Sequence, residues 1–239
     1  SGESQFGQEW SAQITRSGDY LLNMWLQVEF PYLVNVHPTD KLRWVQNLMH
    51  NLVEECSLSF NDLVAARFDS AHLDFWSQFA YSSNKKSQYN AMIGNADYKN
   101  VGEHNKASAQ SFAMNVASGL HESLPGNLSA SSLENFDRPI LYLPLPFFFS
   151  RDSGVALPTA SLPYNEMKVN FKFRNWNSLL LMDDHGDGAD NQMETRHAQV
   201  GLDFNVANGS SLSSTEPRLS NVNVWANYAI VSNDERKRM

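Results

Sequence analysis

The chain has 239 residues, of which 42% are apolar and 12% aromatic, enough to build one large hydrophobic core. Its formal net charge of -8 and its sequence pI of about 5.3 argue against direct nucleic-acid binding, because phosphate binding depends on clustered Lys and Arg. Because Cys56 is the one cysteine, an intrachain disulfide is excluded, and its side chain is expected to be a buried thiol. No apolar run approaches the ~18 residues of a membrane span, so no membrane insertion is expected.

The N-terminal part of the chain predicts strands first and then a short helix. Apolar residues at every second position flank the turn sequence RSGD, which predicts a β-hairpin over residues 9–30. Residues 40–53 instead space their apolar side chains by three and four, which predicts a short amphipathic helix.

A second hairpin and a second helix follow. Two extended runs are joined by Asn61 and Asp62, and both residue types tolerate the left-handed backbone of a tight turn. Residues 70–80 return to helical spacing, with Asp69 or Ser70 as the N-cap. The apolar face of this helix is expected to carry Leu73, Trp76 and Phe79.

The rest of the chain alternates long polar segments with strands. Residues 95–137 and 183–220 are rich in polar residues and lack alternation, which predicts two long loop insertions. Strands are expected at 140–150, 166–174 and 222–232. Short strands, long loops and few helices indicate one all-β sandwich of Ig-like, jelly-roll or barrel kind.

The sequence LPLPFFFSRDSGVALP contains two serines that could be read as nucleophiles. Ser150 and Ser153 lack the G-x-S-x-G elbow, and no histidine spacing indicates a triad. The seven histidines include no H-x-x-x-H or H-E-x-x-H pair, so neither a zinc enzyme nor another cofactor is expected. The structural interpretation is a strand that ends in a turn at Gly154.

One acidic segment partly matches a calcium loop. In DDHGDGADNQME, Asp183, Asp187 and Glu194 fall in the register of the EF-hand pattern. His185 stands at a ligand position and no flanking helices are indicated, so a solvated acidic loop is the other interpretation. Tryptophans at several positions could also stack on sugars, although core packing is commoner at such spacings.

Several long motifs resemble the major capsid proteins of iridoviruses, which belong to the nucleocytoplasmic large DNA viruses. They are FGQEWSAQITRSGDYLL, RWVQNLMHNL, FNDLVAARFD, HLDFWSQF, YNAMIGN, LPLPFFFSRDSGVALPTASLPYNEM and VWANYAIVSNDERKRM, in the order of the family. The resemblance implies that residues 1–239 form the first jelly roll of a double jelly-roll subunit. A second roll would follow the chain, and an outermost N-terminal strand would precede it.

The same resemblance implies a structural protein of the virion and not an enzyme. Three subunits would form a pseudo-hexagonal capsomer, and capsomers would tile an icosahedral shell that assembles in the host cytoplasm. Neighbouring capsomers and minor capsid proteins would be the partners. Two alternatives stay open, a carbohydrate-binding jelly-roll module and a metal-dependent jelly-roll enzyme.

The residues expected to matter in such a protein pack in the core or at interfaces. A strand that continued through Phe149 would place Phe147 and Phe149 on one face and Phe148 on the other, so both faces would need cover. Pro144 and Pro146 limit ladder pairing and predict a strand edge. The expected packing set is Leu143, Leu145, Phe147, Phe148, Phe149, Leu157, Pro158, Leu162, Trp76 and Trp225.

Overall fold

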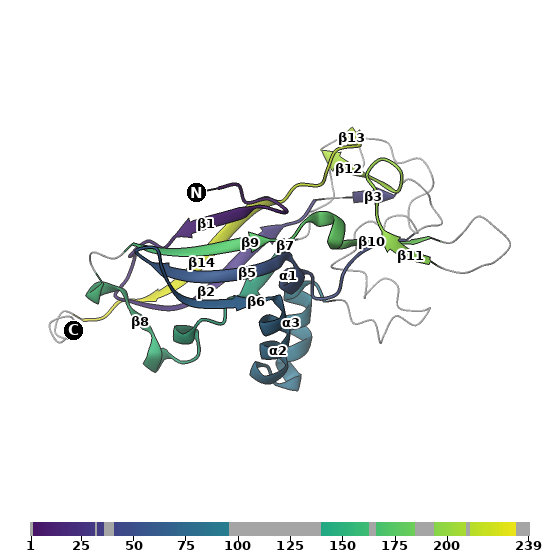
Figure 1. The fold of residues 1–239 in the computed structure, drawn as a ribbon. Coiled ribbons are helices and arrows are strands. Elements are labelled where there is room, and N and C mark those ends of the chain that lie inside the picture. Colours follow the sequence, from purple (N-terminus) through teal and green to yellow (C-terminus); the bar gives the residue numbers. More distant parts are fainter. Residues whose placement is uncertain are drawn as a thin grey trace.

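The computed structural model describes residues 2–31, 33–35, 41–95, 140–162, 166–184, 194–208 and 211–232. Its centre is a sandwich of two antiparallel sheets around a shared core (Figure 1). The first, called the β5 sheet, has the order β1-β9-β5-β6, with strands Glu9–Gln13, Met167–Phe173, Val53–Phe60 and Leu63–Asp69. The second, called the β2 sheet, has the order β14-β2-β7, with strands Ser220–Ala229, Tyr20–Glu29 and Ile140–Pro144; the short β8, Leu157–Pro158, also pairs with β2.

The long strands switch between the two sheets along the chain. β1 lies in the β5 sheet, β2 in the β2 sheet, β5 and β6 in the first again, β7 in the second, β9 in the first and β14 in the second. The chain therefore wraps repeatedly around one core, which is how a jelly-roll sandwich is built. The predicted all-β sandwich is confirmed, and its type is the jelly roll.

Apolar residues at every second position build the core between the sheets. Leu26 and Val28 of β2 are fully buried, as is Val169 of β9. Trp10 of β1 stacks on Phe171 with ring centres 5.6 Å apart. Burying one such side chain stabilises the fold by roughly 1.5–3 kcal/mol.

Three helices lie together beside the sandwich (Figure 1). They are α1, α2 and α3, with bounds Leu48–Leu52, Ser70–Ala80 and Ser83–Ile93. The Asp69 side chain accepts a hydrogen bond from the His72 backbone N–H at 2.8 Å, which confirms the predicted cap of α2. Gly94 ends α3 with φ 74°, and a Cβ there would lie 2.7 Å from Leu141 Cδ1, so both the conformation and the space favour glycine.

Two small sheets extend the molecule at the end away from the C-terminus (Figure 1). One has the order β11-β10-β4, with strands Glu194–His197, Leu180–Asp184 and Lys41–Trp44. The other has the order β13-β12-β3, with strands Ser211–Ser213, Phe204–Asn208 and Leu33–Asn35. Among the described residues, single-turn 3-10 helices lie in connections: η3 Phe148–Ser150, η4 Ser153–Val155, η5 Thr159–Ser161 and η6 Trp176–Ser178.

The two predicted hairpins have different outcomes. β5 and β6 form the second one, and Asn61 and Asp62 have φ 48° and 68° in its turn, as predicted. The first, over residues 9–30, is wrong: β1 pairs with β9, whereas β2 pairs with β14, β7 and β8. Alternation identifies a run as a strand but does not say with which strand it pairs.

Two other predicted segments need correction. The helix expected over residues 40–53 is shorter than predicted: α1 spans only Leu48–Leu52, because the first part of the range forms the strand β4. The polar segment 183–220 is not one loop, since β11, β12 and β13 lie within it. From residue 96 onward, the loop expected at 95–137 falls outside the described residues. Within the described ranges, no helix is long and apolar enough to cross a membrane.

Candidate functional site

The three consecutive phenylalanines leave the sheet instead of extending it. β7 ends at Pro144, and the run continues into the 3-10 helix η3. Phe147 and Phe149 are 1% and 0% exposed and stack on each other with ring centres 5.6 Å apart. Phe148 is 46% exposed, so the expected strand that buries it on a second face is wrong. With three residues per turn, a 3-10 helix can direct two of these rings to the core and the third outward.

The serines that follow show no arrangement for nucleophilic catalysis among the described residues. Ser150 Oγ is buried and has no hydrogen-bond partner there, so no general base contacts it. Ser153 Oγ lies 3.5 Å from Asp152 Oδ1, which is a local contact. The neighbouring Arg151 makes a cation–π contact, because its guanidinium carbon lies 5.3 Å from the centre of a Trp76 ring.

The expected packing set divides into a core group and a surface group. Leu143, Leu145 and Leu157 are buried with Phe147 and Phe149 in the central cluster. Pro158, Leu162 and Trp76 are half-buried. Trp225 is 57% exposed and, with Phe148, forms the surface group.

The calcium-loop candidate lies on a pair of strands. Asp183 stands opposite Thr195, and Asp184 opposite Glu194, where β10 pairs with β11. Asp187 lies outside the described residues. An EF-hand loop connects two helices, whereas strands flank this segment. The parts of the chain that the structure describes contain no cluster of three or more His, Cys, Asp or Glu suited to a metal ion.

A polar cluster centred on the buried His50 joins the three helices. His50 is completely buried, with Nδ1 2.5 Å from Asp74 Oδ1 and Nε2 2.7 Å from the Tyr89 hydroxyl. Burial, and secondarily the charges of neighbouring groups, raises the pKa of Tyr89, so its hydroxyl stays protonated and can donate to Nε2. Asn47 Nδ2 donates to the same Asp74 oxygen at 3.0 Å. The cluster is a satisfied structural link between helices. The partners of His50 lie on α2 and α3, which periodicity within one helix does not bring together.

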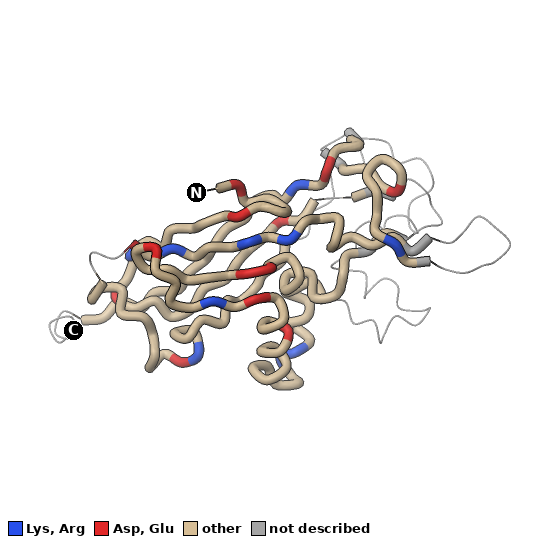
Figure 2. Tube along the Cα trace, in the orientation of Figure 1, with Lys and Arg blue, Asp and Glu red and all other residues tan. Residues whose placement is uncertain are grey.

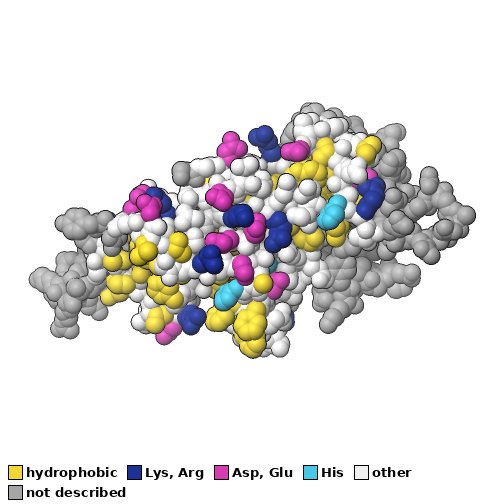
Figure 3. Space-filling model, viewed as in Figure 1, with side chains coloured by type: hydrophobic (Ala, Val, Ile, Leu, Met, Phe, Trp, Pro, Cys, Tyr) yellow, Lys and Arg dark blue, Asp and Glu magenta, His cyan; other side chains and the backbone are white. Residues whose placement is uncertain are grey.

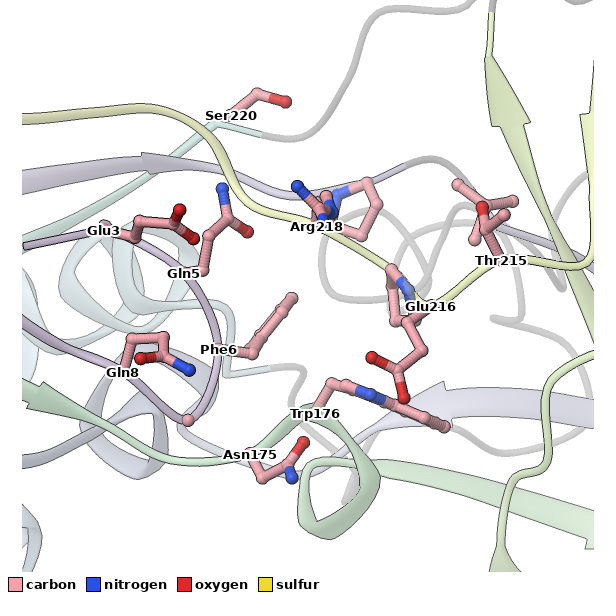
Figure 4. Close-up of a pocket in the computed structure, with 14 residues that line it drawn as sticks. Glu3, Gln5, Phe6, Gln8, Asn175, Trp176, Thr215, Glu216, Arg218 and Ser220 are labelled. Carbon is pink, nitrogen blue, oxygen red and sulfur yellow. The ribbon is translucent and has the colours of Figure 1, made fainter.

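A polar hollow of about 720 Å³ lies between the N-terminal segment and the residues that precede β14 (Figure 4). Asn175 and Trp176, from the connection after β9, line it together with Gln8 of the N-terminal segment and with Glu216 and Arg218 of the segment before β14. An aromatic ring beside amide and carboxylate groups is suited to a neutral polar ligand such as a sugar.

The outer face of the β5 sheet is charged and its polar groups are paired. Lys172 Nζ lies 3.1 Å from Glu54 Oε1, and Lys168 Nζ lies 3.2 Å from Glu166 Oε2. The hydrogen bond and the charge of each glutamate raise the pKa of its lysine partner. Asn170 in the middle of the sheet accepts a hydrogen bond from the Ser11 hydroxyl at 2.7 Å. Figures 2 and 3 show charged residues of both signs across this face, which is typical of a solvent-exposed protein surface.

The outer face of the β2 sheet has a different composition. Its three long strands contain one charged residue, Glu29, whereas the four strands of the β5 sheet contain seven: Glu9, Glu54, Glu55, Arg67, Asp69, Lys168 and Lys172. Trp225 stands opposite Trp25, and Gln27 stands between Asn223 and Tyr142. The β2 sheet therefore presents aromatic rings and amides on a nearly uncharged surface.

Comparison with known proteins places this architecture in one family. A family model described as "Major capsid protein N-terminus" matches residues 1–231. The major capsid protein of Wiseana iridescent virus is 47% identical over 242 residues, which cover 100% of this chain and 43% of the relative. The major capsid protein of Frog virus 3 (isolate Goorha) is 35% identical over 244 residues, which cover 100% of this chain and 45% of the relative.

Solved structures show the same fold at low identity. VP54 of PBCV-1, fitted into a cryo-EM reconstruction of the virophage Sputnik, matches with a TM-score of 0.59 and 17% identity over 99% of this chain and 41% of that chain. The Faustovirus major capsid protein matches with a TM-score of 0.57 and 10% identity over 98% and 53% of the two chains. The chain spans less than half the length of the curated relatives it matches.

Proposed function

The chain belongs to the family of iridovirus major capsid proteins, and we propose on this basis that it is the first jelly roll of a subunit that builds a virion shell. The role is structural and not catalytic. Three full-length subunits form a pseudo-hexagonal capsomer, and capsomers tile an icosahedral shell, with neighbouring capsomers and minor capsid proteins as partners. Assembly takes place in the host cytoplasm, without direct contact to nucleic acid.

One observation carries this proposal: the family match runs through residues 1–231 and coincides with the whole two-sheet sandwich. A rigid sandwich with broad sheet faces is suited to side-by-side packing in a shell, because a closely packed interior resists deformation. The two small sheets lie at one end of the sandwich (Figure 1), and we assign that end to the outer surface of the shell.

The relatives' greater length supports a division of the full-length subunit into two rolls. We propose that the second roll follows this chain and that an additional N-terminal strand pairs with β14. Among the described residues β14 has no strand partner on the edge away from β2. The Gln5 side chain makes two 2.9 Å hydrogen bonds with the backbone of Leu219, which places the N-terminal segment beside the beginning of β14. A strand that precedes this segment in the full-length chain could therefore pair antiparallel with β14.

Native mass spectrometry of the full-length protein tests the proposed assembly. A stable trimer is the expected species, and electron microscopy at higher concentration should show capsomer arrays or shells. A folded full-length protein that stays monomeric at every concentration would contradict the proposal. Circular dichroism on the same sample shows whether the protein is folded.

A carbohydrate-binding module is the second candidate function, and the hollow beside Trp176 favours it. A ring that stacks on a sugar, together with Asn175 and Glu216 as hydrogen-bonding groups, would form such a site. A glycan array with the wild-type protein and the Trp176→Ala variant tests this function. Specific binding that the variant loses would support it, and an array without binding would remove it.

A further inference from the structure

The outer face of the β2 sheet differs from an ordinary solvated sheet surface. Across strands β14, β2 and β7, one row of neighbouring residues consists of Trp225, Trp25 and Pro144. A second row consists of Asn223, Gln27 and Tyr142. The Trp225 indole N–H donates to Gln27 Oε1, so neighbouring strands are tied together on this face. The side chains are large, mostly uncharged and arranged in register across three strands.

Several large apolar side chains of this sheet are left exposed by the described part of the chain, whereas Trp25, Gln27 and Pro144 are half-buried. Trp225 is 57% exposed, Ile140 41% and Tyr142 38%, and Ile230, directly after β14, is 73% exposed. Single exposed apolar residues need no explanation, but a contiguous aromatic face with little charge is typical of a surface that another protein segment covers. The β5 sheet of the same molecule gives the internal comparison, because its outer face carries ion pairs.

We propose that the outer face of the β2 sheet is covered by the part of the full-length polypeptide that follows residue 239. This inference rests on the proposed function and adds the surface on which the two parts of the subunit meet. Trp225, Trp25 and Tyr142 form the centre of the contact, and the amide side chains around them supply hydrogen bonds to the covering segment.

The position of this chain within the longer proteins of its family indicates which segment covers the outer face of the β2 sheet. The chain covers only 43–45% of the curated relatives, and the matching model describes the N-terminal part of the protein. β14 is the last described strand and belongs to the β2 sheet itself, so residues that follow it start at this sheet. A tethered segment has a high effective concentration at a face so near its attachment point, and it therefore reaches this face before a separate copy does.

Photo-crosslinking of the full-length protein tests the proposal. The photoreactive amino acid p-benzoylphenylalanine replaces Trp225 in one variant and Tyr142 in another, and both positions are exposed enough to accept the substitution. The matched control carries it at Leu63, which is 75% exposed in the β5 sheet. Each variant is prepared as an equal mixture of 14N- and 15N-labelled protein, irradiated and digested, and the crosslinked peptides are identified by mass spectrometry.

The expected result at positions 225 and 142 is a crosslink to a peptide beyond residue 239 in which both halves carry the same isotope. The control at position 63 should lack this crosslink. Crosslinks that join a 14N peptide to a 15N peptide would show that a second copy covers the face, and they would overturn the proposal. The proposal would also be overturned if the variants at positions 225 and 142 both fold but neither forms a crosslink to a peptide beyond residue 239. Native mass spectrometry of the same samples separates this failure from failure of the proposed assembly, because trimers can form whichever segment covers the face.

Discussion

The Nε2 atom of His50 lies 2.7 Å from the hydroxyl oxygen of Tyr89, inside the contact between α1 and α3. The other ring nitrogen lies 2.5 Å from Asp74 on α2, so one buried imidazole connects three helices. Such a network restricts the helices to one arrangement, because each alternative would leave buried polar groups without partners.

Replacement of His50 should therefore destabilise the protein. His50→Ala leaves the Tyr89 hydroxyl unpaired and opens a cavity, for an expected loss of about 1–3 kcal/mol in the free energy of unfolding. Tyr89→Phe removes one hydrogen bond and should cost about 0.5–1.5 kcal/mol. Urea unfolding measures both. His72→Ala is the matched control, since His72 is exposed and should change stability by no more than ~0.5 kcal/mol. Equal stability of His50→Ala and the control would contradict the structural role of the cluster.

The phenylalanine run gives a second prediction. Phe149→Ala should lose about 3–5 kcal/mol of stability, because the ring is completely buried. Phe148→Ala should lose no more than about 1 kcal/mol, because nearly half of its surface already faces solvent. Thermal denaturation of the two variants compares them directly. A larger loss for Phe148→Ala would mean that Phe148, and not Phe149, is the core residue.

Cys56 should report on unfolding. Burial, and secondarily the charge of Glu55, raises the pKa of the thiol well above its ordinary value of 9.0. A thiol reagent should therefore react with the protein only after denaturation. Above pH 9.0 the unfolded chain loses the thiol proton while the native chain keeps it, so native stability should fall as pH rises. Cys56→Ala should weaken this fall between about pH 9 and 10. Rapid labelling of the native protein at pH 8 would contradict the buried placement.

Calcium should have little effect on the protein. Strands flank the acidic segment, with Asp184 opposite Glu194, and the paired helices of an EF-hand are replaced by β10 and β11. Differential scanning fluorimetry should therefore give the same melting temperature with millimolar calcium and with EDTA. The Asp187→Asn variant serves as the control. A calcium-dependent rise in the melting temperature that this variant lacks would restore the calcium site.

Local signals in the sequence predicted several elements well. The turn at Asn61 and Asp62 and the cap at Asp69 were predictable because a few neighbouring residues determine them. The pairing of β1 and β2 was not, since both strands alternate in the same way whichever sheet they join. The sequence motifs indicated the family, and through it the jelly-roll class.

The candidate surfaces were less predictable than the fold. Three adjacent phenylalanines fit a buried strand as well as a 3-10 turn, and only the structure shows that Phe148 points outward. The nearly uncharged face of the β2 sheet became visible once Trp225, Trp25 and Tyr142 were placed on neighbouring strands, although they are far apart in the chain. Periodicity describes one strand at a time, so it does not reveal a surface that three strands share.

Cryo-electron microscopy of particles assembled from the full-length protein tests the central claim most directly. The account predicts density for the two-sheet sandwich in the shell itself, three times in each capsomer, with the small sheets β11-β10-β4 and β13-β12-β3 toward the outside. Particles whose shell density lacks this sandwich, or a folded full-length protein that assembles into no shell, would contradict the assignment as a shell-building subunit.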